Sequence, residues 1–164
     1  MIESNVISEF VADLFPKASL RPEGHSADAA LKAAKMRLFV EIWSSKVQGA
    51  IFAPFFGPGD KDASTKILNG LKNDIVPLLK ENGGPYVLGK EFSMAEVLTH
   101  SFALRLFAFA KEGFYGDELY GELQKIKEVK EWHDAIAARE STKKTWNEKD
   151  TIDGMKKMLA SRNK

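Results

Sequence analysis

The strongest constraint on this chain is a helix start between Phe92 and Val97. Ser93 is a common N-cap residue, and Glu96 follows three positions later, where its carboxylate can accept from the Ser93 amide in a capping box. Phe92 and Val97 have the spacing of a hydrophobic staple. The helix that follows is apolar on more than one side, so we expect it to lie at the centre of the fold.

Apolar residues repeat with the period of an α-helix along most of the chain. This period predicts helices over 6–14, 26–52, 62–79, 93–107, 117–124 and 129–136, and a short terminal helix capped by Thr151. No segment alternates clearly between apolar and polar residues. The chain is therefore predicted to be all-α, a helical bundle with two long antiparallel helices at its centre and no substantial sheet.

Several details of these helices are also predicted. Ser26 is the expected N-cap of the second helix, and Asp60 or Asp62 opens the third, in which Pro77 should cause a kink or a late break. The residues that the second helix is expected to bury are Leu31, Ala34, Leu38 and Ile42. The stretch 57–60, Gly-Pro-Gly-Asp, is predicted to be a turn.

Composition excludes several classes of protein. The net charge is +1, so no overall field attracts nucleic acid or an anionic membrane. No apolar run reaches the ~18 residues that span a bilayer. The chain has no cysteine, which excludes disulfides, thiolate metal sites and a cysteine nucleophile within it, and fits a cytoplasmic protein.

The three histidines are too scattered in the sequence to indicate a metal site. His100 is predicted to be a core or boundary residue on the central helix, and His25 and His133 are predicted to lie at the surface.

Three segments of the chain resemble the glutathione transferase family. Residues 83–98 are similar to the segment that leads into the core helix of the family's C-terminal domain, where Leu-Gly precedes Ser or Thr, Ala and an acid, usually Asp. Residues 3–16 resemble its Glu-Ser motif and the last helix of its thioredoxin-like domain. Residues 132–145 resemble its late helix and the turn after it.

The resemblance implies a division of the chain into two parts. Residues 1–17 correspond to a remnant of the thioredoxin-like domain and residues 18–164 to the helical C-terminal domain. In the family, the thioredoxin-like domain supplies a Tyr, Ser or Cys that activates the glutathione thiol. This chain begins at the Glu-Ser pair, so we predict no catalytic residue within it. The sequence leaves open whether it is a fragment of a longer protein or a natural short form.

Site residues follow from the same resemblance. Glu3 and Ser4, at a helix start, would bind the γ-glutamyl carboxylate of glutathione as co-substrate; the alternative is that Ser4 only caps its own helix. No metal is expected. A stripe on the long second helix is predicted to form the apolar walls of an acceptor-substrate pocket. The alternative is that the stripe is simply core, because this spacing is also typical of core residues. Its residues are Trp43, Val47, Gln48, Ile51, Phe52 and Phe55.

Two functions remain open from the sequence. The first is a glutathione transferase-like enzyme that supplies the pocket for a hydrophobic small molecule, for conjugation or glutathione-dependent isomerisation. The second is a non-catalytic interaction module that assembles with a protein partner, as related helical domains do in translation elongation factor subunits and tRNA-synthetase assemblies. The resemblance also suggests a homodimer through the two long helices.

Overall fold

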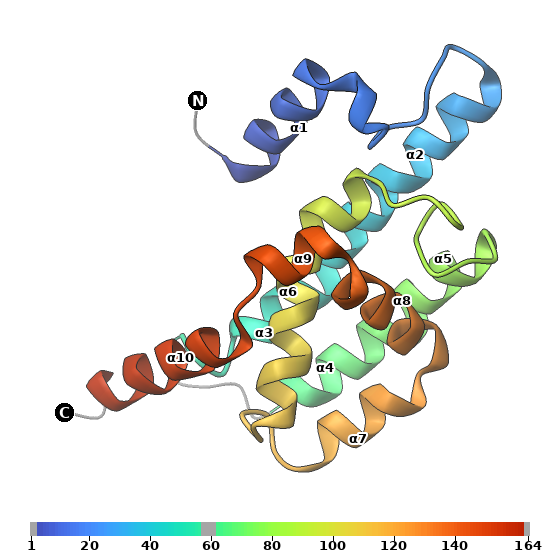
Figure 1. The fold of residues 1–164 in the computed structure, drawn as a ribbon. Coiled ribbons are helices and arrows are strands. Elements are labelled where there is room, and N and C mark those ends of the chain that lie inside the picture. Colours follow the sequence, from blue (N-terminus) through green and yellow to red (C-terminus); the bar gives the residue numbers. More distant parts are fainter. Residues whose placement is uncertain (1–2, 57–61, 163–164) are drawn as a thin grey trace.

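The computed structural model describes residues 3–56 and 62–162, which fold into a bundle of helices (Figure 1). No strand occurs among these residues. Two isolated antiparallel bridges, Tyr86 with Gly89 and Leu88 with Glu91, close the turn before the central helix. The predicted all-α fold is confirmed. The predicted turn at 57–60 and the possible helix start at Asp60 lie outside the described residues.

The first half of the chain contains two long helical runs and one outlying helix. Its elements are α1 (Ser4–Leu14), the 3₁₀ turn η1 (Pro16–Ala18), α2 (Ala27–Ile42), the π-helical η2 (Trp43–Gln48), α3 (Gly49–Phe52), α4 (Ala63–Asn69), the π-helical η3 (Gly70–Ile75) and α5 (Val76–Glu81). The hydroxyl of Ser26 accepts from the Ala29 amide at 3.1 Å, which confirms the predicted cap of α2. Helical winding continues to Phe52, as the sequence predicts.

The two π-helical segments lie against each other, and Gly70 allows this contact. A Cβ atom at Gly70 would stand 3.0 Å from the Lys46 carbonyl oxygen and 3.0 Å from a methyl carbon of Val47. Near Pro77 the winding changes from π-helical to α-helical. Because Pro77 lies in the first turn of α5, its missing N–H leaves little hydrogen bonding unsatisfied.

The second half of the chain is built around the central helix. Its elements are α6 (Met94–Lys111), α7 (Glu118–Lys125), α8 (Lys127–Ala138), α9 (Glu140–Thr145) and α10 (Glu148–Arg162). The predicted cap at Thr151 is wrong. The last helix begins at Glu148, because the side chain of Asn147 accepts from the Asp150 amide at 3.1 Å and caps it earlier. Helix α9 was not predicted, since it has a single buried residue, Thr142.

The predicted capping box at the start of α6 is present. The Ser93 hydroxyl accepts from the Ala95 amide at 3.2 Å, and the Glu96 carboxylate accepts from the Ser93 amide at 2.9 Å and from its hydroxyl at 2.8 Å. The same carboxylate accepts from the Val87 amide at 2.7 Å and from the indole nitrogen of Trp132 at 3.3 Å. Glu96 is fully buried, so one side chain joins the preceding turn, α6 and α8.

The predicted buried side of α2 is wrong. Leu31 and Leu38 are 55% and 47% exposed, Ala34 is exposed and Ile42 is half-buried. The residues of this run that enter the core are instead Met36, Phe39, Trp43 and Val47. The predicted set and the observed set both repeat with helical spacing. The observed set is buried because its aromatic rings pack against Trp132 of α8, with ring centroids 5.5 Å apart for Phe39 and 5.2 Å apart for Trp43.

We predict that Glu96→Ala lowers the free energy of unfolding by about 3 kcal/mol, because it leaves several buried donors without an acceptor. Urea unfolding followed by circular dichroism measures this change. The matched control is Glu118→Ala, which removes an exposed glutamate from the first turn of α7 and should change the free energy by less than about 0.5 kcal/mol. Equal effects of the two substitutions would contradict the role given to Glu96.

Candidate functional site

The start of α1 has an unusual backbone conformation. Glu3 is the N-cap residue with φ of 72°, and it and Ser19 are the non-glycine residues with positive φ among residues 3–56 and 62–162. Such a conformation costs on the order of 1–3 kcal/mol and occurs most often at binding sites and active sites. Glu3 makes no side-chain capping bond, and Ser4 is the first residue inside the helix. Ser4 is therefore not the N-cap residue of α1.

Helix α1 lies at the edge of the bundle (Figure 1). None of its residues is buried. The exposed apolar residues of α1 and the turn after it are Val6, Ile7, Phe10, Val11, Leu14 and Phe15. Its polar side faces the bundle, where the Arg21 guanidinium lies 3.5 Å from the Glu9 carboxylate and 3.0 Å from that of Asp13.

A small cavity lies between α1 and the bundle, beside the contacts that α1 makes with α6. It measures about 110 Å³, and its lining includes Asn5 and Glu9 of α1, Val40 of α2, and Met94 and Leu98 of α6. Helix α1 contributes only polar residues to this lining and α6 only apolar ones, whereas α2 contributes both kinds, with Arg37 and Glu41 beside Met36 and Val40. The strained start of α1 therefore lies close to the surface formed by the two long helices.

The residues predicted for the acceptor pocket divide into two groups. Trp43, Val47, Ile51 and Phe55 lie inside the hydrophobic core, between 0% and 2% exposed. Gln48 and Phe52 are half-buried and reach the surface. In this conformation, only the second group is accessible to a ligand.

Phe52 belongs to an aromatic cluster on the surface of the bundle. Its ring lies 5.9 Å from that of Phe102 on α6 and 6.2 Å from that of Phe56, which is 59% exposed. Phe102 and Phe56 are not among the residues predicted for the acceptor pocket. Phe102 could have been predicted as a pocket residue from its position on the central helix, because the resemblance places that helix beside the acceptor substrate.

The histidines differ partly from expectation. His100 is half-buried, and its Nδ1 lies 2.9 Å from the Val97 carbonyl oxygen, as expected for a boundary residue. His25 is exposed as predicted. His133 is not an open surface residue, because its ring stacks on Phe107 with centroids 3.8 Å apart and its side chain is 17% exposed. In the described ranges, no group of three histidine, aspartate or glutamate side chains is placed to hold a metal ion.

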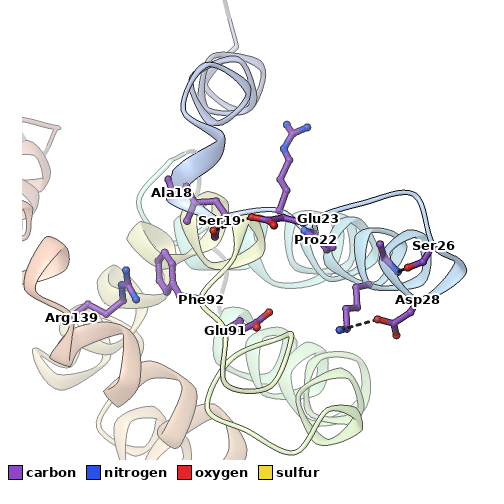
Figure 2. A pocket seen from close by; sticks show the side chains of 13 residues that line it. Ala18, Ser19, Pro22, Glu23, Ser26, Asp28, Glu91, Phe92 and Arg139 are labelled. Carbon is purple, nitrogen blue, oxygen red and sulfur yellow. Dashed lines mark hydrogen bonds and ion pairs between the residues drawn. The ribbon is translucent and has the colours of Figure 1, made fainter.

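A larger cavity lies between the linker after α1, the start of α2 and the turn before α6 (Figure 2). Its volume is about 630 Å³. Figure 2 shows Arg139 beside the Phe92 ring at one end, and the guanidinium carbon lies 3.7 Å from the ring centroid. At the other end, Lys32 pairs with Asp28 at 3.0 Å. Three basic and three acidic side chains line the cavity, so it presents no net charge to a ligand: Arg21, Lys32, Arg139, Glu23, Asp28 and Glu91.

The hydrophobic staple expected between Phe92 and Val97 at the start of α6 stays a prediction.

Solved structures similar to this chain are glutathione transferases. The glutathione transferases Omega 1C, Omega 2C and Omega 2S from Trametes versicolor match 98%, 97% and 97% of the chain, with TM-scores of 0.80, 0.78 and 0.77. Their sequence identities to it are 24%, 27% and 24%. The chain spans 66% of the first two proteins and 68% of the third. No protein-family model and no curated protein matches the sequence.

These likenesses establish the fold. The helical bundle has the fold of the all-helical C-terminal domain of glutathione transferases, as the resemblance predicted, and the matched length also includes α1. No helix within the described ranges is both long and apolar enough to cross a membrane.

We predict that Trp43→Ala lowers the free energy of unfolding by about 3–5 kcal/mol, because it leaves a cavity in the core. Phe52→Ala should lower it by less than about 2 kcal/mol, since the Phe52 ring is only half-buried. Urea unfolding of the two variants measures both changes. A smaller loss for Trp43→Ala than for Phe52→Ala would contradict the division into core and surface residues.

Proposed function

We propose that this chain, which has the fold of the glutathione transferase C-terminal domain, supplies the acceptor-substrate surface of a glutathione transferase-like protein. The reaction is glutathione conjugation of a hydrophobic electrophile or a glutathione-dependent isomerisation. The observation that carries the proposal is the strained backbone at Glu3, at the start of a helix whose first amides are free to bind an anion.

The glutathione site is proposed at Glu3 and Ser4. A positive φ at a glutamate costs free energy, and such strain persists most often where a ligand needs the geometry. Both residues are exposed. The Ser4 hydroxyl and the first amides of α1 offer donors at the positive end of the helix dipole, which suits a carboxylate. The γ-glutamyl carboxylate of glutathione is the group that the resemblance implies.

The apolar face of α1 is the proposed contact with a thioredoxin-like domain. Val6, Phe10 and Leu14 are 52%, 47% and 57% exposed, and a contiguous apolar face of this kind is usually covered by another surface. We assign residues 1–17 to that domain and residues 18–164 to the helical domain. The residue that activates the thiol belongs to the thioredoxin-like domain, and no catalytic residue is proposed in this chain.

The acceptor substrate is proposed to contact the aromatic cluster of Phe52, Phe56 and Phe102, with Gln48 as a polar neighbour. Aromatic walls with few polar groups favour an apolar electrophile. Trp43, Val47, Ile51 and Phe55 support this surface from the core behind it. The protein contributes by holding the electrophile against the glutathione thiolate, which converts a collision between two molecules into a reaction within one complex.

We predict that Ser4→Ala weakens glutathione binding by the natural protein about tenfold, because a hydrogen bond to a charged group is lost. Isothermal titration calorimetry measures the affinity. Ser8→Ala is the matched control one turn further along α1, and it should leave the affinity unchanged. Unchanged affinity in Ser4→Ala would remove Ser4 from the site.

A second candidate function is assembly, and the outer side of α2 favours it. Leu31 and Leu38 are exposed two turns apart on this side, with Ala34 between them. An apolar stripe on a long helix suits packing against a second helix. The proposed partner is a second copy of the chain, which joins through α2 into a homodimer. A non-catalytic interaction module would use the same stripe for another protein.

Leu38→Glu is expected to convert this dimer into monomers at micromolar concentration, because a two-fold interface would bury the new charge twice. Sedimentation velocity measures the change in mass. Leu14→Glu, on the exposed face of α1, should leave the dimer intact. A wild-type chain that sediments as a monomer would contradict the dimer. Loss of the dimer only in Leu14→Glu would assign it to α1 instead.

The remaining assignments follow from the same proposal. A glutathione-dependent enzyme without disulfides fits the cytoplasm, and glutathione acts as its co-substrate without a metal. A net charge of +1 gives no reason to expect nucleic acid or a membrane as a partner.

A further inference from the structure

A cavity with aromatic walls lies between α6, α7, α8 and the segment that joins α9 to α10. Its volume is about 270 Å³, near the lower end of small-molecule sites. Four rings contribute to its lining: Phe107, Tyr120, His133 and Trp146. The cavity shares no lining residue with the proposed glutathione site, the aromatic cluster around Phe52 or the cavity in Figure 2.

Three of the four rings pack against another aromatic or cationic group. His133 lies nearly flat on Phe107, with an angle of 13° between the rings. The Arg105 guanidinium lies 5.8 Å from the centroid of Trp146, within the range of a cation–π contact. Flat rings bind well between aromatic side chains by offset and edge-on contacts. The walls therefore favour a flat aromatic ligand.

The hydrogen bond of His133 decides which polar group such a ligand needs. Its Nδ1 lies 3.1 Å from a carboxylate oxygen of Asp134, and because a carboxylate only accepts, Nδ1 carries the proton. Burial lowers the pKa of the His133 imidazole, against the opposing effect of Asp134. The ring is therefore neutral at neutral pH, and its Nε2 has a lone pair that can accept a hydrogen bond.

Charged groups around His133 are largely paired with one another. Lys130 donates to Asp134, and Lys111 lies 3.2 Å from the Glu148 carboxylate at the other side of the cavity. Because the Nε2 lone pair accepts a hydrogen bond, a ligand carboxylate, which also only accepts, would not pair with it. A ligand hydroxyl group can donate a hydrogen bond to Nε2.

We propose that this cavity is a second ligand site, which binds a flat aromatic ring bearing a hydroxyl group that donates to His133 Nε2. The inference is independent of the proposed glutathione chemistry, because it rests on residues of α6, α7, α8 and the segment around Trp146.

The test compares 2-naphthol with 2-methoxynaphthalene, which has the same rings but no hydroxyl proton. Isothermal titration calorimetry on the whole chain should show 2-naphthol binding about tenfold more tightly, the value of one hydrogen bond of about 1.4 kcal/mol. In nitrogen-15 spectra, 2-naphthol should shift the Nε2 resonance of His133. Equal affinities, or an unshifted Nε2 resonance at saturation, would overturn the proposal.

Substitution of His133 tests whether 2-naphthol binds in this cavity. His133→Phe keeps the stack on Phe107 but removes the acceptor, so it should bind 2-naphthol about tenfold more weakly and 2-methoxynaphthalene as before. His25→Phe, at an exposed position, is the matched control and should bind like the wild type. Unchanged 2-naphthol affinity in His133→Phe would overturn the proposal.

Two further substitutions separate this site from the aromatic cluster on α3 and α6. Ala137→Phe places a bulky side chain in the lining of the cavity and should abolish 2-naphthol binding. Phe52→Ala should not affect it. Binding that survives Ala137→Phe, or that is lost in Phe52→Ala, would show that 2-naphthol binds elsewhere and would overturn the proposal.

Discussion

The buried carboxylate of Glu96 is the interaction on which the rest of this fold depends. It accepts from Val87 in the turn, from Ser93 at the start of α6 and from Trp132 on α8. Removing a charge from water is costly, and these donors offset that cost. Because Trp132 also packs against Phe39 and Trp43, the same group fixes how α8 meets α2. The surface that carries the proposed acceptor site is held by this network.

The proposed acceptor surface and glutathione site differ in how firmly the fold holds them. Phe52 ends the continuous helical run α2–η2–α3 and Phe102 lies on α6, and both have buried residues on their inner sides that support the aromatic cluster. Glu3 and Ser4 lie on α1, which has no buried residue. The proposed thioredoxin-like domain would add the packing that α1 lacks. The two halves of the proposed active site are thus brought together through the position of one helix.

Sequence patterns predicted the parts of this structure that depend on local chemistry. The caps at Ser26 and Ser93 were predicted because their hydrogen bonds involve residues within one turn. Which side of α2 is buried was not predicted correctly. The Leu38 side and the Phe39 side both have helical spacing, and only the contact with Trp132 decides between them. Phe102 was not predicted and His133 was predicted to lie at the surface for the same reason. Phe102 contacts Phe52, which is distant in sequence, and His133 stacks on Phe107 of another helix.

The attachment of α1 to the bundle has a consequence for how this molecule responds to salt. Arg21 joins the linker to Glu9 and Asp13 through ion pairs whose side chains are between 33% and 62% exposed. At 1 M ionic strength the Debye length falls to about 3 Å, so such pairs lose most of their attraction, whereas apolar packing does not. We therefore expect added salt to weaken the link between α1 and the segment that follows it, while the apolar packing of the bundle persists. The amides of α1 should then exchange with solvent deuterium sooner than those of α6.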